Sequence, residues 1–128
     1  MTARTERILI IDADEAARAD LSRYLETRGF YVTGCSSRAA AQGEVSDGST
    51  VPDVIFADLQ PDGIRELAGQ LEEKDAFIPI VACSDSTSSV DVVNALRAGA
   101  SDFVLKPYTD DKGALDDVLW PVMEHRGR

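Results

Sequence analysis

The chain alternates short apolar runs with longer stretches of helical periodicity, and this alternation restricts the folds that it can adopt. Apolar runs that are bounded by polar residues and separated by helix-like segments are typical of buried parallel strands joined by crossover helices. The pattern therefore predicts an α/β fold, with a doubly wound, five-stranded parallel sheet and helices on both faces. The predicted strands lie near Ile8–Ile11, Phe30–Gly34, Val54–Ala57, Ile78–Cys83 and Phe103–Leu105.

Helix-like segments fill the intervals between these strands and follow the last one. Gly29 and Gly99 are expected to end the first and fourth helices, and Ser36 or Ser37 to cap the second. Pro121 lies inside the fifth segment, where it is expected to kink or shorten the helix. The predicted helices are Glu15–Arg28, Ser37–Ser46, Ile64–Lys74, Ser88–Ala98 and Asp110–Glu124.

The size and the N-terminal residues of the chain bound its organisation. A length of 128 residues predicts a single domain, with its core over about residues 7–124 and no effector domain. The N-terminal residues are polar and lead directly into a strand, so they do not resemble a signal peptide. No apolar run reaches the roughly 20 residues that cross a bilayer. We therefore expect a cytoplasmic location.

Charge and cysteine usage exclude several classes of function. A net charge of −10 repels nucleic-acid phosphates and anionic lipid, so we expect no direct nucleic-acid partner and no membrane partner. The two cysteines, Cys35 and Cys83, fit neither a disulfide framework nor a zinc motif. Cys83 falls within an apolar strand pattern and is predicted to be a small buried residue.

Polar residues stand where four of the predicted strands end. Asp12 follows the first strand, Asp58 the third, Ser84 the fourth and Lys106 the fifth. In an open α/β sheet the functional site lies beyond the carboxyl ends of the strands, so these residues are expected to meet at one edge. Two carboxylates, a hydroxyl and an ammonium at one place suit a hard cation and a phosphoryl group.

Several stretches resemble the receiver domain of two-component response regulators, in an order and spacing that cover nearly the whole chain. The most specific is the last, in which an alanine-and-glycine turn precedes an aromatic residue, a short strand and Lys-Pro. The resemblance implies a flavodoxin-like sheet of strand order 2-1-3-4-5. The matching stretches are Ile8–Asp12, Pro52–Leu59, Ile78–Ser84 and Ala95–Pro107.

The same resemblance implies a role for each residue at the edge of the sheet. Asp58 corresponds to the phosphoacceptor, which takes a phosphoryl group from a histidine kinase. Lys106 would pair with Asp58 and then with the phosphoryl oxygens, and Ser84 would donate a hydrogen bond to them. Phe103 corresponds to the aromatic switch that turns inward when Ser84 moves. The Lys106–Pro107 peptide bond is expected to be cis.

The implied cofactor is Mg²⁺, and here the chain departs from the family pattern. Asp12, Asp58 and the backbone carbonyl of Gln60 match positions that hold the metal. Ala13 stands where the family usually has a second acid, which puts the Mg²⁺ affinity in question. Asp14 could replace that acid, or it could cap the first helix, as its place before Glu15 suggests.

The resemblance also implies the partners, and it leaves an alternative function open. A histidine kinase or phosphotransfer protein would donate the phosphoryl group, and a downstream protein would bind the fourth helix, fifth strand and fifth helix. Family members also form homodimers through the fourth and fifth helices. Such a domain is not an enzyme in the ordinary sense. The alternative is a pseudo-receiver that lacks efficient phosphorylation because of Ala13 and because the loop Asp58–Gly63 is shorter than is typical of the family; it would act as a constitutive protein-interaction module.

Overall fold

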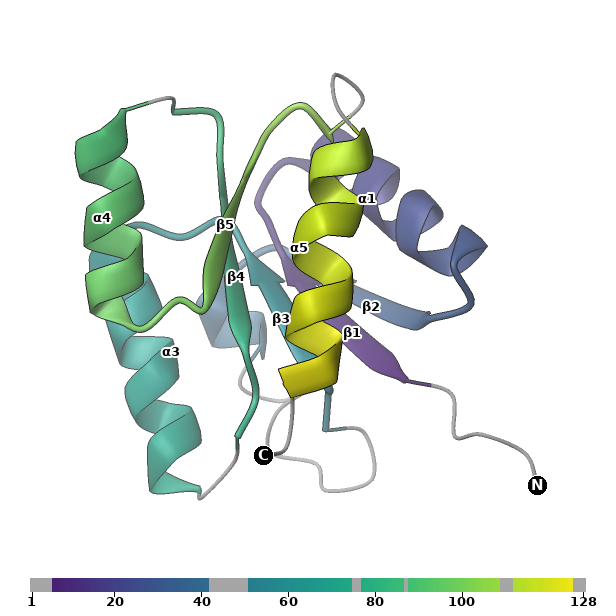
Figure 1. The fold of residues 1–128 in the computed structure, drawn as a ribbon. Helices are drawn as coiled ribbons and strands as arrows, with labels where there is room; N and C mark the ends of the chain where they lie inside the picture. The colour runs from purple at the N-terminus through teal and green to yellow at the C-terminus, as the bar shows by residue number, and fades with distance from the viewer. Residues whose placement is uncertain (1–5, 42–50, 75–76, 87, 109–111, 126–128) are drawn as a thin grey trace.

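A parallel sheet runs through the centre of the molecule. In a computed structural model, which describes residues 6–41, 51–74, 77–86, 88–108 and 112–125, five strands pair in the order β2-β1-β3-β4-β5 (Figure 1). Every pairing is parallel, which confirms the predicted fold class and strand order. The strands are β1 (Arg7–Ile11), β2 (Tyr31–Cys35), β3 (Val54–Ala57), β4 (Ile80–Ser84) and β5 (Asp102–Leu105).

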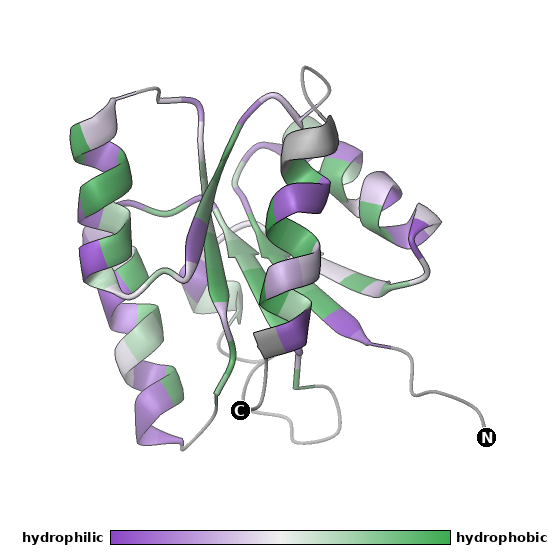
Figure 2. Cartoon of the chain, viewed as in Figure 1, coloured by the Kyte–Doolittle hydropathy of each residue, from purple (hydrophilic) through white to green (hydrophobic). Residues whose placement is uncertain are grey.

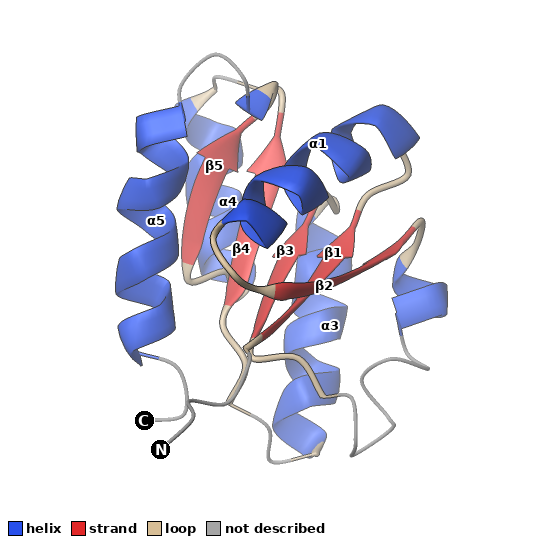
Figure 3. Ribbon diagram, turned by 90° about the vertical axis from the view of Figure 1, so that its right-hand side faces the viewer, coloured by secondary structure: helices blue, strands red, loops and turns tan. Residues whose placement is uncertain are grey.

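Helices cover both faces of this sheet (Figure 3). Two of them, α1 (Glu15–Thr27) and α5 (Lys112–His125), pack on one face. The other face carries α3 (Pro61–Glu73) and α4 (Ser89–Ala98). Of the second predicted helix, residues 38–41 are helical, and Ser37 caps them by accepting a hydrogen bond from the Ala40 amide at 3.2 Å. The remainder of that predicted helix lies outside the described residues.

Most element boundaries shift by one to three residues from their predicted places, and a proline bears on three of the elements. α3 begins at Pro61, three residues before the predicted start, because a proline in the first turn has no amide hydrogen to leave unpaired. α5 continues through Pro121 to His125, so the expectation that this proline shortens the helix was wrong. β4 begins at Ile80 rather than Ile78, because the preceding Pro79 has no amide hydrogen for the ladder.

Two apolar cores lie on either side of the sheet, since successive strand residues point to opposite faces. Ile8 and Ile10 of β1 join the core beneath α1 and α5, and Leu9 and Ile11 join the core beneath α3 and α4. Figure 2 shows strands that are largely apolar between helices that carry both polar and apolar residues. Within the described residues, no helix combines the length and apolar character needed to cross a membrane.

Glycine ends the first and fourth helices, as predicted. Gly29 and Gly99 have φ angles of 93° and 122°, a region that other residues rarely adopt. Gly99 also lies where α4 approaches α3, because a Cβ at this position would be 2.9 Å from the Cβ of Ala68. The chain therefore turns into β2 and towards β5 directly after each helix.

Candidate functional site

Residues that are far apart in the chain meet at the carboxyl edge of the sheet. Asp12 follows β1, Asp58 follows β3, Ser84 ends β4 and Lys106 follows β5. Backbone hydrogen bonds continue the ladder to three of them: the Asp12 amide donates to Cys35, the Asp58 amide to Ile11, and the Lys106 amide to Ser84, at 3.0, 2.8 and 2.8 Å. The sheet itself therefore sets their positions. We call Asp12, Asp58, Ser84 and Lys106 the acidic pocket.

The Lys106 ammonium bridges the two carboxylates of the acidic pocket. Its Nζ lies 2.9 Å from Oδ2 of Asp12 and 2.5 Å from Oδ2 of Asp58. The Lys106 side chain is 12% exposed, that of Asp12 is 4% exposed and that of Asp58 is 34% exposed. Lys106 and Asp12 are thus both shielded from solvent, while the Asp58 carboxylate remains open to a reactant. The Lys106–Pro107 bond that follows is cis, as predicted.

The surroundings of Lys106 keep its ammonium protonated. Burial alone would lower the pKa of Lys106, because it disfavours the charged form. Hydrogen bonds to Asp58 and Asp12, and the charges of the same carboxylates, outweigh this effect and raise the pKa above its ordinary value. A fixed positive charge beside a carboxylate is suited to stabilising the negative charge of an incoming phosphoryl group.

Ser84 and Phe103 lie on neighbouring strands beside the ion pairs. The Ser84 hydroxyl accepts a hydrogen bond from the Ser86 amide at 3.0 Å, so its own proton remains available for an acceptor such as a phosphoryl oxygen. Phe103 pairs with Ala82 in the ladder and packs, partly buried, against the core beneath α3 and α4. Its ring therefore lies against the α3–α4 core and keeps contact with solvent.

Two of the residues expected to serve Mg²⁺ have other partners in the structure. Asp14 caps α1, as one of the sequence interpretations held: its Oδ1 accepts hydrogen bonds from the amides of Ala16 and Ala17 at 3.0 and 3.3 Å. The shortened loop makes Gln60 the residue before α3, and its carbonyl accepts the first helical hydrogen bond, from the Ile64 amide at 3.0 Å. Both residues therefore help to start helices.

The donor set of the acidic pocket suits a hard cation in kind. The carboxylate oxygens of Asp12 and Asp58, together with the backbone carbonyl oxygen of Gln60, are ligands of the kind that Mg²⁺ prefers. Only two acids converge, however, and in the described part of the chain no three His, Cys, Asp or Glu side chains gather closely enough to hold a metal ion. Asp12, Asp58 and the Gln60 carbonyl would hold Mg²⁺, and the absent third carboxylate, at Ala13, predicts that they would hold it weakly.

Sequence reasoning missed an ionic network that joins α1 to α5. The Arg28 guanidinium forms two hydrogen bonds of 3.1 Å with the Asp116 carboxylate, and the Tyr24 hydroxyl donates to the same carboxylate. The guanidinium also lies 4.2 Å from the centre of the Tyr24 ring. Burial, together with the bond to Asp116, raises the pKa of Tyr24 to about 12. A helix pattern gives no signal for such a contact, because Tyr24 and Asp116 are distant in sequence.

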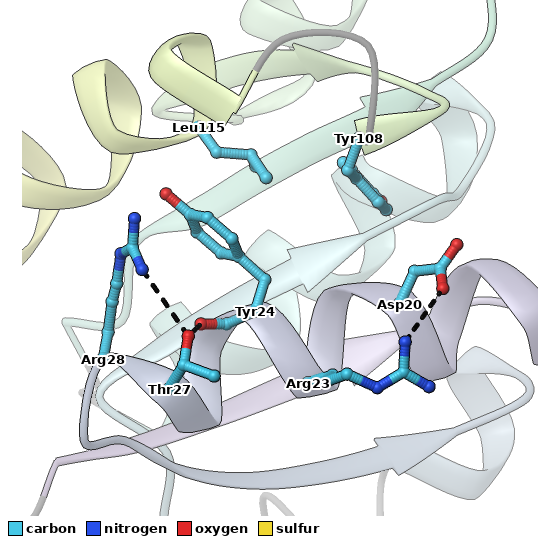
Figure 4. A pocket seen from close by; sticks show the side chains of 7 residues that line it. All are labelled: Asp20, Arg23, Tyr24, Thr27, Arg28, Tyr108 and Leu115. Atoms are coloured by element: carbon cyan, nitrogen blue, oxygen red, sulfur yellow. Dashed lines mark hydrogen bonds and ion pairs between the residues drawn. The ribbon is translucent and has the colours of Figure 1, made fainter.

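Beside this network, a hollow of about 200 Å³ opens between α1 and α5. Tyr24, Tyr108 and Leu115 line it with apolar surface, and charged side chains of α1 surround them (Figure 4). Tyr108 comes two residues after Lys106, so the hollow lies next to the segment that carries the lysine. Two further missed residues are Arg18, which bonds to the Asp12 carbonyl, and Gly34, which lies against the Arg18 side chain; both are considered below.

Comparison with known proteins identifies this architecture. A family model described as the response regulator receiver domain matches residues 8–115. The chain belongs to this family. Receiver domains are signalling modules of two-component systems; they interact with histidine kinases or phosphotransfer proteins, and they typically bind Mg²⁺ in their acidic pocket.

Individual relatives agree with this assignment. The C4-dicarboxylate transport transcriptional regulatory protein DctD of Pseudomonas aeruginosa is 32% identical over 122 residues, which are 94% of this chain and 26% of DctD. The chain therefore spans about a quarter of the length of that relative. Among solved structures, the chemotaxis protein CheY4 of Vibrio cholerae has a TM-score of 0.78 at 21% identity, covering 93% of this chain and 99% of CheY4.

A further structural neighbour comes from a complex. It is a chain in the co-crystal structure of the Saccharomyces cerevisiae histidine phosphotransfer signalling protein Ypd1 with the receiver domain of its response regulator Ssk1. Its TM-score is 0.74 at 20% identity, covering 91% of this chain and 87% of that chain. Like CheY4, it shows the shared fold.

Proposed function

We propose that this receiver domain accepts a phosphoryl group on Asp58 from a histidine kinase or phosphotransfer protein and signals through protein contacts. One observation carries the proposal: the Lys106 ammonium bridges Asp12 and Asp58 at the edge of the sheet, while Asp58 stays accessible. We further propose that residues 7–124 act as one receiver unit and that it works in the cytoplasm. The net charge of −10 disfavours direct binding to nucleic acid or anionic membranes.

The proposed reaction transfers phosphorus from nitrogen to oxygen. A carboxylate oxygen of Asp58 attacks the phosphorus of a phosphohistidine, an O–P bond forms and the N–P bond breaks. The electron pair of the broken bond stays on the histidine nitrogen, and the ring leaves as neutral imidazole because its other nitrogen has taken up a proton from water. Lys106 stabilises the transferring oxygens by charge, and Ser84 donates a hydrogen bond to one of them. When bound, Mg²⁺ would supply further positive charge to the phosphoryl oxygens.

The proposed switch uses neighbouring strands. Ser84 and Phe103 lie on β4 and β5, which pair along their length. If the Ser84 hydroxyl moved towards a phosphoryl group, it would therefore move close to the Phe103 ring. Phe103 is only partly buried, so an inward turn would remove more of its ring from water. We propose that this inward turn changes the surface formed by α4, β5 and α5.

Exposed apolar side chains on α4 and β5 support that output surface. Water-exposed apolar groups on neighbouring elements favour contact with another protein. A downstream partner or a second copy of the chain would cover them, and the homodimer is one proposed form of this contact. These side chains are Val90, Val93 and Leu96 of α4 and Leu105 of β5.

A mass measurement tests the phosphoacceptor role. The protein is incubated with Mg²⁺ and a small acyl-phosphate donor, and intact mass and phosphosite are determined, with Asp58→Ala as control. We expect one Mg²⁺-dependent phosphoryl adduct that disappears in the control. A folded protein that never acquires the adduct would contradict the proposal and leave the domain as a constitutive protein-interaction module.

A further inference from the structure

Asp12 is held at each of its polar groups. Its amide donates to the Cys35 carbonyl at 3.0 Å, and its own carbonyl accepts from Nη1 of Arg18 at 2.7 Å. Its Oδ1 accepts from the Asp14 amide and its Oδ2 from Lys106, each at 2.9 Å. The residue is 3% exposed, so water contributes little to these contacts. Asp12 therefore acts as a fixed support for the lysine.

The Arg18 side chain passes over β2 at Gly34 to reach Asp12. Arg18 is in the second turn of α1, and its side chain passes over Gly34 on the edge strand. A Cβ at residue 34 would lie 3.0 Å from Cδ and 3.1 Å from Cγ of Arg18. Glycine within a strand often marks such a close approach. Gly34 thus leaves the space through which the guanidinium reaches the edge of the sheet.

These contacts fix the direction of the Asp12 side chain. The bond to Cys35 holds the peptide before Asp12, and the bond from Arg18 holds the peptide after it. Fixing both peptide planes fixes φ and ψ, and with them the direction in which the carboxylate leaves the backbone. The next residue is Ala13, whose methyl group can offer no comparable anchor.

We propose that Arg18 is a positioning residue of the acidic pocket: it holds the Asp12 carbonyl so that the Asp12 carboxylate aims Lys106 at Asp58. Gly34 is part of the same device, because it provides the path for the Arg18 side chain. The proposal rests on the proposed function insofar as it concerns phosphoryl transfer. The alignment of Lys106, however, is a property of the folded protein and can be measured without a donor.

Gly34 offers a second way to disturb the device. The φ angle of Gly34 is in a region open to other residues, since only Gly29 and Gly99 have positive φ among the described glycines. Valine is favoured in strands, so Gly34→Val should preserve β2, while the valine side chain occupies the space through which the Arg18 side chain passes. The matched control is Arg23→Ala, which removes an exposed arginine from the same helix.

The experiment compares the full chain with Arg18→Ala, Arg18→Lys, Gly34→Val and Arg23→Ala. The first measurement is the NMR signal of the Lys106 side-chain ammonium, assigned by its loss in Lys106→Met. The second is the rate of Asp58 phosphorylation by a small acyl phosphate at saturating Mg²⁺. Thermal unfolding confirms that each variant is folded.

We expect Arg18→Ala and Gly34→Val to broaden the Lys106 signal and to slow phosphorylation by about tenfold. Arg18→Lys should restore part of both, because an ammonium also donates to a carbonyl. Arg23→Ala should match the unaltered chain. A Lys106 signal that is unchanged in Arg18→Ala would overturn the proposal. If neither the unaltered chain nor any variant is phosphorylated, the proposed function fails, and the NMR comparison still decides the role of Arg18.

Discussion

At the scale of single residues, the two carboxylates beside Lys106 differ in what they can do. The Asp12 side chain is 4% exposed and is held on every side, whereas the Asp58 side chain is 34% exposed. A nucleophile needs an open approach to phosphorus, and a support needs fixed geometry. The difference in exposure thus agrees with the proposed roles of Asp58 as the acceptor and Asp12 as the support, although both residues are aspartates that follow buried strands.

The residue after Asp12 allows a test of the metal site. Ala13→Asp restores a third carboxylate, and we expect it to raise the Mg²⁺ affinity by about tenfold, because each added charged oxygen ligand strengthens a hard-cation site. Calorimetric or NMR titration of the unphosphorylated protein measures the affinity. An affinity equal to that of the unaltered chain would mean that two carboxylates already suffice.

Asp14→Ser is the matched comparison. Serine retains the capping oxygen of α1 but carries no charge. We expect this variant to bind Mg²⁺ as the unaltered chain does, because the Asp14 carboxylate is engaged with the amides of Ala16 and Ala17. A loss of affinity in Asp14→Ser would instead identify Asp14 as the substitute ligand.

At the scale of elements, the packing of α4 on α3 depends on Gly99, which has a hydrogen atom where other residues have a side chain. Gly99 ends α4 at a φ of 122°, and a Cβ there would press on Ala68 at 2.9 Å. Gly29 ends α1 at a φ of 93° with no atom within 4 Å of an added Cβ. The two helix ends therefore share the backbone requirement and differ in the contact.

Alanine substitutions separate these two effects. We expect Gly29→Ala to lower the free energy of unfolding by about 1–2 kcal/mol, through backbone strain alone. Gly99→Ala should lower it further, by about another 1 kcal/mol, because the two methyl groups collide. Urea unfolding measures both changes. Equal losses of unfolding free energy in the two variants would show that the α3–α4 contact adjusts to the added methyl group at no cost.

Gly69→Ala serves as the control for this pair. Gly69 lies inside α3, and an added Cβ meets no atom within 4 Å. Alanine is favoured over glycine in a helix interior by up to about 1 kcal/mol. The same urea titration should therefore show Gly69→Ala as more stable than the unaltered chain.

The contact between α1 and α5 should respond to alkaline pH. Burial and the bond to Asp116 raise the pKa of Tyr24 to about 12, whereas tyrosine in an unfolded chain ionises near pH 10. The neutral phenol therefore stabilises the fold fully below about pH 10, and this contribution is lost as the pH rises from there through about 12. The advantage of the unaltered chain over Tyr24→Phe in urea unfolding should shrink between pH 8 and pH 11. A difference that stays constant over this range would exclude the linkage.

At the scale of the whole molecule, the fold followed from the sequence more readily than the site did. Apolar runs such as Val54–Ala57 mark strands because a parallel sheet is buried on both faces, and their ends indicated where Asp12, Asp58, Ser84 and Lys106 would meet. That these residues meet, and that the Lys106–Pro107 bond is cis, was confirmed. Their roles in phosphorylation stay predictions.

What could not be predicted depends on contacts between distant elements. In the sequence, Arg18 is an ordinary polar residue of an amphipathic helix. Only the folded sheet places Gly34 next to its side chain. Glycine within the predicted strand was the one signal of a close approach, and it named no partner. Similarly, the third helix was predicted to start at Ile64, because only the path of the shortened loop decides whether Pro61 belongs to that loop or begins the helix.

The position of the single tryptophan has a consequence for spectroscopy. Trp120 is on α5, 47% exposed, with its ring 5.8 Å from that of Phe30, and it is not part of the acidic pocket. Its fluorescence emission should therefore be insensitive to a cation that only enters the pocket. A change in emission after phosphorylation would instead report a change where α5 meets the start of β2, so the chain carries an intrinsic optical probe of one helix of its proposed output surface.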